Sequence, residues 1–269
     1  MSFISSLESV LQAHKSHSPG EVEDEKLETR FQTWAKESMV KNGPLTILAI
    51  TSTVPGGAPI EGHRTGMGKT TLALRVARKY THYHPEQERF DTIGEEGFYS
   101  ESEEAYGPVN ESLFADPWEM KDALFSRMRK GVRTPVAIWD DVEKAAPSTT
   151  GITRKLSSLL GEIYTWRYAV GMIIMTFPGL AEIQAKAAKL PDFEFIIPRR
   201  GTVDMQQHHF QRDWRNPRVP RQKMRQLGLG AAFGPLPPNE QAWYDGWRMR
   251  SMLGDQEPTL TAKRPEAQW

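Results

Sequence analysis

The segment GMGKTT at residues 66–71 constrains this chain most, because it has the form of the second half of a phosphate-binding loop. Glycines let backbone N–H groups turn inward onto phosphate oxygens. A lysine then reaches the β- and γ-phosphates, and a hydroxyl ligates Mg²⁺. Lys69 and Thr70 stand at these two positions. A helix expected over 70–82 would direct the positive end of its dipole at the same phosphates, so the segment predicts a site for ATP and Mg²⁺.

The start of the loop departs from the pattern G-x-x-x-x-G-K-[ST]. His63 stands where the first glycine is expected, and Gly62 lies one residue earlier. Either the first turn is built with a non-glycine residue, or the loop is one residue longer. The other interpretation is a glycine-rich turn that opens an ordinary helix. The residues expected to bind the nucleotide are His63, Arg64, Thr65, Gly66, Met67, Gly68, Lys69, Thr70 and Thr71.

Two carboxylates, Asp140 and Asp141, end the apolar run that starts at Thr134. A strand that ends in a carboxylate, parallel to the strand before the phosphate loop, brings that carboxylate to the Mg²⁺, the arrangement known as Walker B. We expect Asp140 to hold the metal with Thr70, and Asp141 to polarise the attacking water. Related enzymes usually carry the longer Glu at the second position. The alternative is a pair of exposed acids in a loop.

Further candidates follow later strands. Thr176 ends the run 170–176 and would either contact the γ-phosphate or its water, or be an ordinary residue at a strand end. Arg199 and Arg200 follow the run 193–197. An arginine supplied across a subunit interface would stabilise charge on the γ-phosphate in the transition state, although each of these side chains could equally be a solvated surface arginine. Arg154 and Arg167 are candidates for the same role.

The order of apolar runs predicts an α/β fold with a parallel sheet and right-handed crossovers. We expect an N-terminal helical extension over 1–42, a P-loop ATPase domain over 43–203, and a basic C-terminal extension over 204–269 with one short helix and a disordered end. Expected strands are 45–51, 134–141, 170–176 and 193–197; expected helices are 4–14, 26–41, 70–82, 117–130, 152–168, 179–189 and 239–252, with a loop over 226–238.

Charge is balanced over the whole chain, with 34 basic and 34 acidic residues, so no global field indicates nucleic acid. Two segments are nevertheless biased. The stretch 85–104 is acidic and predicts either a solvated insertion or a surface for a basic partner. The stretch 199–225 is basic and contains Phe210 and Trp214, which predicts either DNA contacts or a solvated flank. His208 and His209 alone make no metal site.

The chain contains no cysteine, which excludes disulfides and thiolate chemistry. It has no apolar run of about 18 residues, and its first residues lack the pattern of a signal peptide. These observations favour a protein of the cytoplasm that has no membrane partner.

The ordered motifs GMGKTT, AIWDD at 137–141 and MIIMT at 172–176 resemble those of AAA+ P-loop ATPases. More narrowly, residues 45–203 resemble the DnaA/IstB-like ATPases of archaeal viruses such as fuselloviruses, and of related plasmids. The resemblance implies ATP hydrolysis in the host cytoplasm and assembly into a homo-oligomer such as a hexamer. It also implies DNA and a helicase or another replication protein as partners, in replication of a mobile element. The alternatives are a DNA translocase or genome-packaging ATPase, a small-molecule kinase, and a nucleotide switch that does not hydrolyse.

Overall fold

The computed structural model describes residues 21–52, 67–81, 83–84, 89–90, 112–147, 153–212, 220–236 and 238–253. The contacts divide the chain into two units, 1–235 and 236–269. The helix expected over 4–14 and most of the acidic stretch 85–104 lie outside the described residues. Within that stretch, β3 (Arg89–Phe90) pairs with β2 (Tyr83–His84) as a small antiparallel ladder.

The first unit is built on a seven-stranded sheet with the order β4-β5-β6-β1-β7-β8-β9. The first five strands in this order are parallel, and β8 and β9 are antiparallel additions. The strands are β1 (Thr46–Thr51), β4 (Leu113–Phe114), β5 (Thr134–Trp139), β6 (Val170–Thr176), β7 (Phe193–Ile196), β8 (Thr202–Arg212) and β9 (Pro220–Ala232). The strand before the phosphate loop, β1, is therefore separated from β5 by β6.

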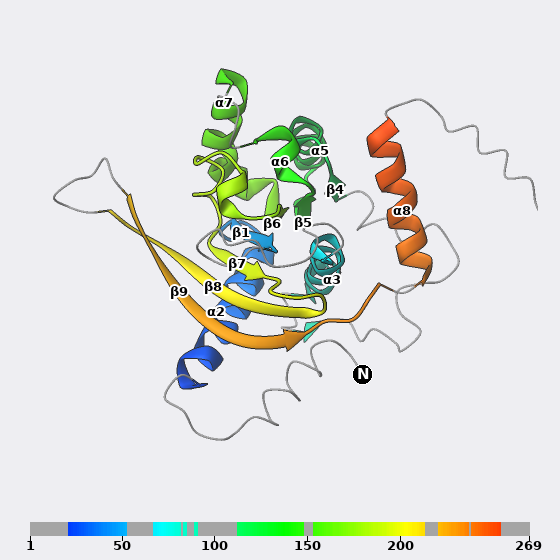
Figure 1. Ribbon diagram of the computed structural model, residues 1–269. Coiled ribbons are helices and arrows are strands. Elements are labelled where there is room, and N and C mark those ends of the chain that lie inside the picture. The colour runs from blue at the N-terminus through cyan, green and yellow to red at the C-terminus, as the bar shows by residue number, and fades with distance from the viewer. Residues whose placement is uncertain are drawn as a thin grey trace, which may run out of the picture. The chain divides into compact units, whose positions relative to one another are not determined.

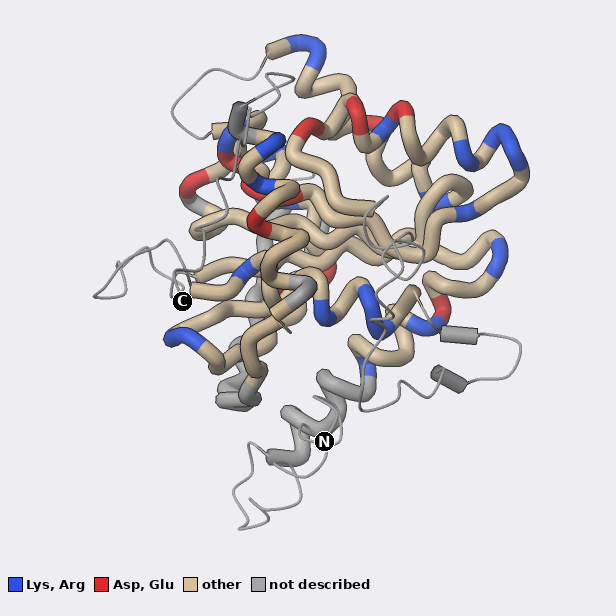
Figure 2. The backbone as a smooth tube through the Cα atoms, turned by 90° about the vertical axis from the view of Figure 1, so that its right-hand side faces the viewer, with Lys and Arg blue, Asp and Glu red and all other residues tan. Residues whose placement is uncertain are grey.

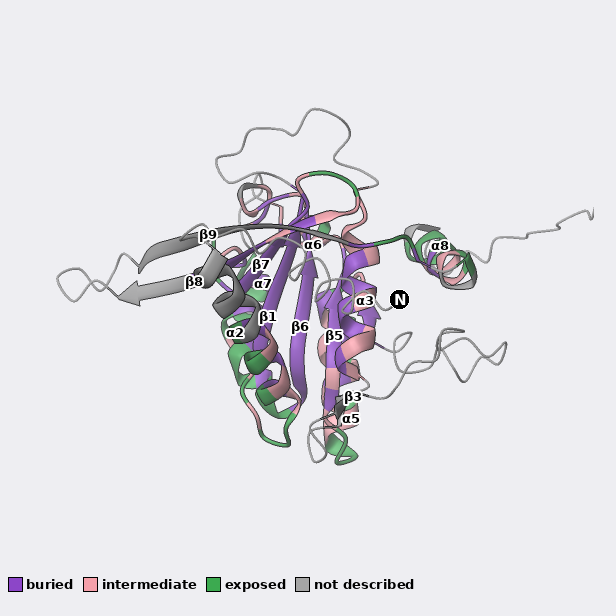
Figure 3. Cartoon of the chain, turned by 90° about the horizontal axis from the view of Figure 1, so that it is seen from below, coloured by how far each residue is buried: buried purple, intermediate pink, exposed green. Residues whose placement is uncertain are grey.

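Helices cover both faces of this sheet. α2 (Glu21–Met39) and α3 (Lys69–Thr81) lie on one face, and α5 (Pro117–Arg129) and α7 (Arg154–Glu162) lie on the other (Figure 1). Every residue of β1 and β6 is buried, as expected of parallel strands covered on both sides (Figure 3). The mixed α/β fold with a mostly parallel sheet is thus confirmed.

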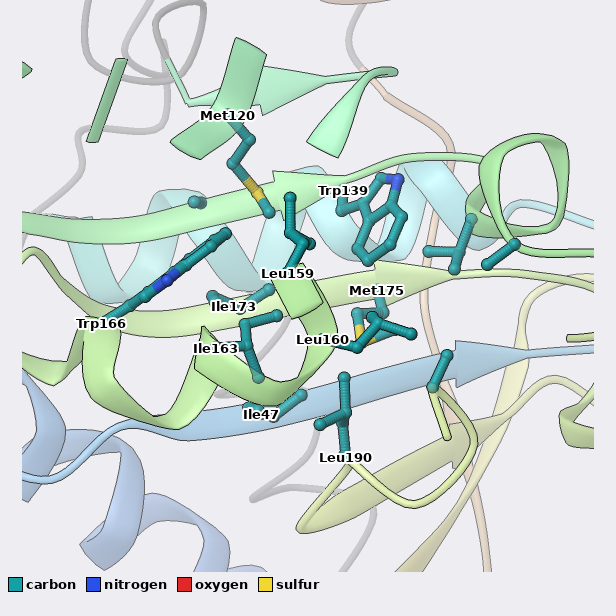
Figure 4. Close-up of a cluster of buried hydrophobic side chains, with 14 of the residues drawn as sticks. Ile47, Met120, Trp139, Leu159, Leu160, Ile163, Trp166, Ile173, Met175 and Leu190 are labelled. Carbon is teal, nitrogen blue, oxygen red and sulfur yellow. The ribbon is translucent and has the colours of Figure 1, made fainter. Parts of the chain in front are cut away.

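The core beneath α5 and α7 is continuous and aromatic at its centre. Trp139 of β5 and Trp166 are fully buried, with Leu159 and Leu160 of α7 packed between them and Ile47 of β1 (Figure 4). Burial of each such side chain contributes about 2 kcal/mol. This core fixes the relative positions of β1, β5 and β6, whose carboxyl ends carry the candidate site.

The start of α5 shows how local chemistry sets a boundary that the sequence predicted. The side chain of Asp116 accepts hydrogen bonds from the backbone N–H groups of Trp118 and Glu119, and Pro117 occupies the first turn. Both features satisfy or remove N–H groups that a helix start leaves without partners. The helix expected over 117–130 is confirmed.

Arg133 fixes the edge of the sheet opposite to the site. Its guanidinium donates to the backbone carbonyl oxygens of Ser38, near the end of α2, and of Gly43, in the connection from α2 to β1. It also donates to the carbonyl oxygen of Val170 at the start of β6. Burial lowers the pKa of Arg133. A single side chain therefore ties the start of β6 to the segment that leads into β1.

The helix expected over 179–189 is wrong. The structure has only a short 3₁₀ turn, η4 (Leu180–Glu182), after which Ile183 forms an isolated bridge with Pro147. The side-chain amide of Gln184 donates to the carbonyl of Pro147. These bonds hold Ile183 in an extended conformation, and residues 185–189 form turns, where the apolar spacing suggested a helix. The helix expected over 152–168 is split, since α7 gives way to the 3₁₀ helix η3 (Ile163–Tyr168).

The loop expected over 226–238 is wrong in its first part, because β9 continues to Ala232 and pairs with β8, whereas residues 233–236 have no regular structure, as expected. β8 pairs in turn with β7, so the hairpin extends the central sheet (Figure 1). The boundary expected at 203/204 falls inside β8, and the contacts place the division between Pro235 and Leu236. The physical reason is that both strands continue the hydrogen-bond ladder of the sheet, which a basic composition does not reveal.

The second unit contains the expected C-terminal helix, α8 (Pro238–Leu253), on which Tyr244 and Trp247 stack with ring centroids 6.0 Å apart. Acidic and basic segments are interspersed along the described chain (Figure 2). Over the described residues, no helix has the length and apolar character needed to cross a membrane.

Candidate nucleotide-binding site

The described part of the phosphate loop ends as the sequence predicts. Gly68 has φ of +91°, a conformation that strongly favours glycine, and Lys69 begins α3. The backbone N–H of Leu72 donates to the carbonyl of Gly68 at 2.9 Å. No acidic residue lies in the first turn of α3, so the positive end of this helix is left for an external anion. Met67 and Thr71 flank this turn; His63, Arg64, Thr65 and Gly66 lie outside the described residues.

Asp140 joins three elements at the carboxyl edge of the sheet. It follows β5 and is 2% exposed. Its Oδ1 accepts a hydrogen bond from the hydroxyl of Thr70 at 2.8 Å and one from the hydroxyl of Thr176 at 2.5 Å. Because β6 lies between β1 and β5, residues from α3, β5 and β6 meet at one point. The structure thus brings together both predicted metal ligands and Thr176.

The donor set suits Mg²⁺. The hydroxyl oxygen of Thr70 and the carboxylate of Asp140 are hard oxygen ligands within hydrogen-bond distance of each other. Mg²⁺ usually binds through one or two protein oxygens plus waters and substrate phosphates. Among the described residues, no group of three His, Cys, Asp or Glu side chains could form a metal cage. A site of this kind would be completed by the nucleotide.

Thr176 links the ends of β5 and β6. Its hydroxyl donates to Asp140 and accepts from the backbone N–H of Asp141 at 3.0 Å, and the residue is fully buried. From the sequence, Thr176 was expected either to contact the γ-phosphate or its water, or to be an ordinary residue at the end of a strand. The structure places the hydroxyl on Asp140, where it orients the carboxylate predicted to hold the metal.

Asp141 points its carboxylate to a neighbour on its own helix. Its backbone has φ of 52° and ψ of 50°, in the left-handed region, and it precedes the short helix α6 (Val142–Ala145). Its Oδ2 forms an ion pair with the ammonium of Lys144 at 2.7 Å. The group expected to polarise the attacking water is therefore already paired with a cation in this structure.

Glu143 is a candidate that the sequence interpretation missed. It lies in α6, is half-buried, and among the described residues its buried Oε2 has no hydrogen-bond partner. Burial raises the pKa of Glu143, its own backbone N–H lowers it, and the charges of Asp141, Lys69 and Asp140 act on it as well. Its position three residues after Asp140, at the start of a helix, is the sequence signal that could have found it.

Phe233 covers the turn of the phosphate loop. A Cβ built on Gly68 would lie 3.1 Å from the ring of Phe233, which follows β9 directly. The backbone N–H of Phe233 donates to the carbonyl of Gly201 at 2.8 Å, and the guanidinium of Arg75 on α3 donates to the carbonyl of Pro235. The end of the hairpin is thus attached to the loop and to α3.

The arginines expected to act in catalysis do not touch this cluster. Arg199 and Arg200 are exposed in the turn between β7 and β8, on the same edge of the sheet as Thr176. Arg154 is exposed at the start of α7. Arg167 is exposed just before β6, at the opposite edge, and donates to the hydroxyl of Tyr168. A role for any of these arginines at a subunit interface stays a prediction.

A buried polar chain runs beside the loop strand. The hydroxyl of Thr51, the last residue of β1, donates to Glu194 of β7 at 2.7 Å, and Glu194 contacts the Nε2 of His208 at 3.1 Å. His208 is buried. Glu194 therefore holds the side chain of His208 inside the sheet.

No protein-family model matches this sequence, and no curated protein sequence matches it. Solved structures with a weak likeness to this chain include the genome packaging NTPase B204 from Sulfolobus turreted icosahedral virus 2 in complex with ATP-gammaS, at 12% identity and a TM-score of 0.32, covering 58% of this chain and 75% of that chain. Another is the N-terminal domain of zonular occludens toxin from Neisseria meningitidis, at 12% identity and a TM-score of 0.34, covering 71% of this chain and 100% of that chain. At these scores the likenesses carry no functional argument, so the function is inferred from the site itself.

Proposed function

We propose that this chain is a Mg²⁺-dependent ATPase that acts on DNA or on DNA-bound proteins. The observation that carries the proposal is the hydrogen-bonded group of Thr70, Asp140 and Thr176 beside the N-terminus of α3. If Thr70 had only a structural role at the start of α3, it would not require the buried carboxylate of Asp140 beside its hydroxyl. Removal of that carboxylate from water is costly, and a bound cation offsets such a cost.

Each residue has a distinct task in this proposal. Lys69 binds the β- and γ-phosphates, and the N–H groups at the start of α3 bind phosphate oxygens. Thr70 and Asp140 hold the Mg²⁺, which neutralises charge that develops on the phosphates. Thr176 fixes the carboxylate of Asp140. Arg199 or Arg200 of a neighbouring copy completes the charge stabilisation in a homo-oligomer.

The DNA component of the proposal comes from the hairpin. β9 carries Arg221, Lys223 and Arg225 at alternate positions, in the part of the strand that pairs with 207–211 of β8. Regularly spaced cations on an extended strand suit a phosphate backbone. The replication role and a helicase or other replication protein as partner belong to the same proposal and rest on the sequence resemblance alone.

A second candidate, a DNA translocase or genome-packaging ATPase, is favoured by Phe233. The basic hairpin is part of the sheet, and its end packs on Gly68 of the phosphate loop. A change in the loop on nucleotide binding would therefore move the end of the DNA-contacting strand. A motor needs such a link, whereas a loader needs chiefly a surface for its partner protein.

The test is ATP turnover of the full chain with no DNA, with single-stranded DNA and with double-stranded DNA, together with the mass of the oligomer with and without ATP. Turnover that needs Mg²⁺ and rises with DNA supports the proposal, and preference for double strands favours the translocase. Lys69→Ala should abolish ATP binding. Wild-type affinity for ATP in that variant would refute the site assignment.

A further inference from the structure

We infer that Glu143, and not Asp141, is the carboxylate that accepts the proton of the attacking water. The inference rests on the proposed ATPase function and assigns a role that the sequence pattern gives to the residue after Asp140. Its basis is the placement of three side chains, Lys69, Asp141 and Glu143, at the carboxyl end of β5.

The first step is the position of Glu143 relative to the phosphates. Lys69 is the residue that reaches the β- and γ-phosphates, and the carboxyl group of Glu143 lies within electrostatic reach of Lys69 and Asp140. Glu143 follows Asp140 by three residues at the carboxyl edge of the sheet, the edge at which Lys69 begins α3. Glu143 also lies in α6, whose residue Val142 is fully buried in the core, so its backbone is held in place.

The second step is that Glu143 has a spare acceptor. Among the described residues, nothing donates a hydrogen bond to its buried Oε2. A buried carboxylate oxygen without a partner destabilises the folded state. Such a group is retained where a ligand or a water supplies the missing donor in the working state.

The third step is that Asp141 is already engaged. Its Oδ2 is paired with Lys144 at 2.7 Å, and its left-handed backbone begins the turn into α6. Use of Asp141 as the base would break this pair and leave Lys144, which is largely exposed, to solvent. The backbone N–H of Asp141 is also held by Thr176 at 3.0 Å, which fixes the backbone position of this residue.

The chemical step is then as follows. The water oxygen forms a bond to the γ-phosphorus while the bond from that phosphorus to the β–γ bridging oxygen breaks. The bridging oxygen leaves with the bonding electrons as part of ADP. The water proton passes to the carboxylate of Glu143, which later releases it to solvent or phosphate. Removal of a general base of this kind costs about 100-fold or more in rate.

The experiment compares four forms of the full chain: wild type, Glu143→Gln, Asp141→Asn and Glu37→Gln. Glu37 is exposed on α2 and controls for the same chemical change. Turnover, affinity for Mg·ATP and the ratio of ATP to ADP that remains bound are measured, and the circular dichroism melt verifies folding. Glu143→Asp keeps the carboxylate and serves if Glu143→Gln does not fold.

We expect Glu143→Gln to lose about 100-fold or more in turnover, to bind Mg·ATP as the wild type does, and to retain unhydrolysed ATP. Asp141→Asn should lose far less, and Glu143→Asp should keep measurable turnover. Full turnover in Glu143→Gln, or a larger loss in Asp141→Asn than in Glu143→Gln, overturns the inference while the ATPase proposal stands. A wild type that binds ATP but never hydrolyses it overturns both.

Discussion

Asp192 directly precedes β7 and should make the free energy of unfolding of this protein depend on pH. One substitution of this residue should remove that dependence. Its Oδ2 accepts a hydrogen bond from the backbone N–H of Ile47 at 2.8 Å. Burial raises the pKa of Asp192 from 3.8 to about 6, against the opposing effects of the Ile47 N–H and of His208. The folded state therefore binds this proton more tightly than the unfolded chain does.

The magnitude follows from the two pKa values. The difference between 3.8 and about 6 corresponds to about 3 kcal/mol, because each pKa unit is worth about 1.4 kcal/mol. This is an upper bound, since the side chain keeps some exposure and is screened. A raised pKa in the folded state gives stability that is fully present below 3.8 and is lost as the pH rises through about 6.

Asp192→Asn retains an oxygen that can accept the Ile47 N–H and has no proton to lose. We expect the free energy of unfolding of this variant, relative to that of the wild type, to rise by up to about 3 kcal/mol between about pH 4 and pH 7. Urea denaturation of both proteins across this range measures the difference. Asp122→Asn, at an exposed position on α5, is the matched control. A difference between Asp192→Asn and the wild type that does not change with pH would refute the reasoning.

Three further substitutions test the fold and the site. Gly171→Ala on β6 would bring a Cβ within 2.5 and 2.8 Å of two backbone carbonyl oxygens, so we expect a loss of about 3 kcal/mol in the free energy of unfolding, measured in urea. Gly68→Ala should cost about 1–3 kcal/mol from its positive φ and contact with Phe233, and weaken ATP binding in titration calorimetry. Thr176→Val should retain ATP binding yet slow turnover, because Asp140 loses a hydrogen bond of 2.5 Å; turnover equal to that of the wild type would contradict the role given to Thr176.

The parallel strands could be predicted from the sequence because their residues form continuous apolar runs. β1 and β6 are buried along their whole length, and a strand covered on both faces has to be apolar throughout. The order of the strands in the sheet is a different matter. It depends on contacts such as those of Trp139 and Trp166 with α5 and α7, which the spacing of residues along the chain does not contain.

The hairpin of β8 and β9 could not be predicted because several buried positions of β8 are polar. Gln206, Gln207 and His208 are all buried. Gln207 accepts a hydrogen bond from Arg30 of α2, and His208 contacts Glu194 of β7. The partners of Gln207 and His208 are far away in the sequence, and polar residues at consecutive buried positions interrupt the alternation of apolar and polar residues that marks a strand.

Part of the candidate site could be predicted because each role in it requires a certain type of residue at a fixed distance from the end of a strand. Thr70 and Asp140 follow that rule, and the structure brings them within 2.8 Å. Asp141 follows the rule as well, but its role depends on which way the chain turns after Asp140. The left-handed turn and the Lys144 pair are properties of the folded backbone, and no spacing rule predicts them.

The same turn explains why two carboxylates near one metal site have such different surroundings. After β5 the chain needs one residue to reverse direction into α6, and Asp141 supplies it, with its N–H held by Thr176. The turn leaves the side chain of Asp141 beside Lys144 and brings that of Glu143 within reach of Lys69. Two carboxylates whose environments differ in this way take different roles in acid–base chemistry. One is paired with Lys144 at the edge of the site, whereas the other is half-buried with an oxygen that only a new donor can satisfy.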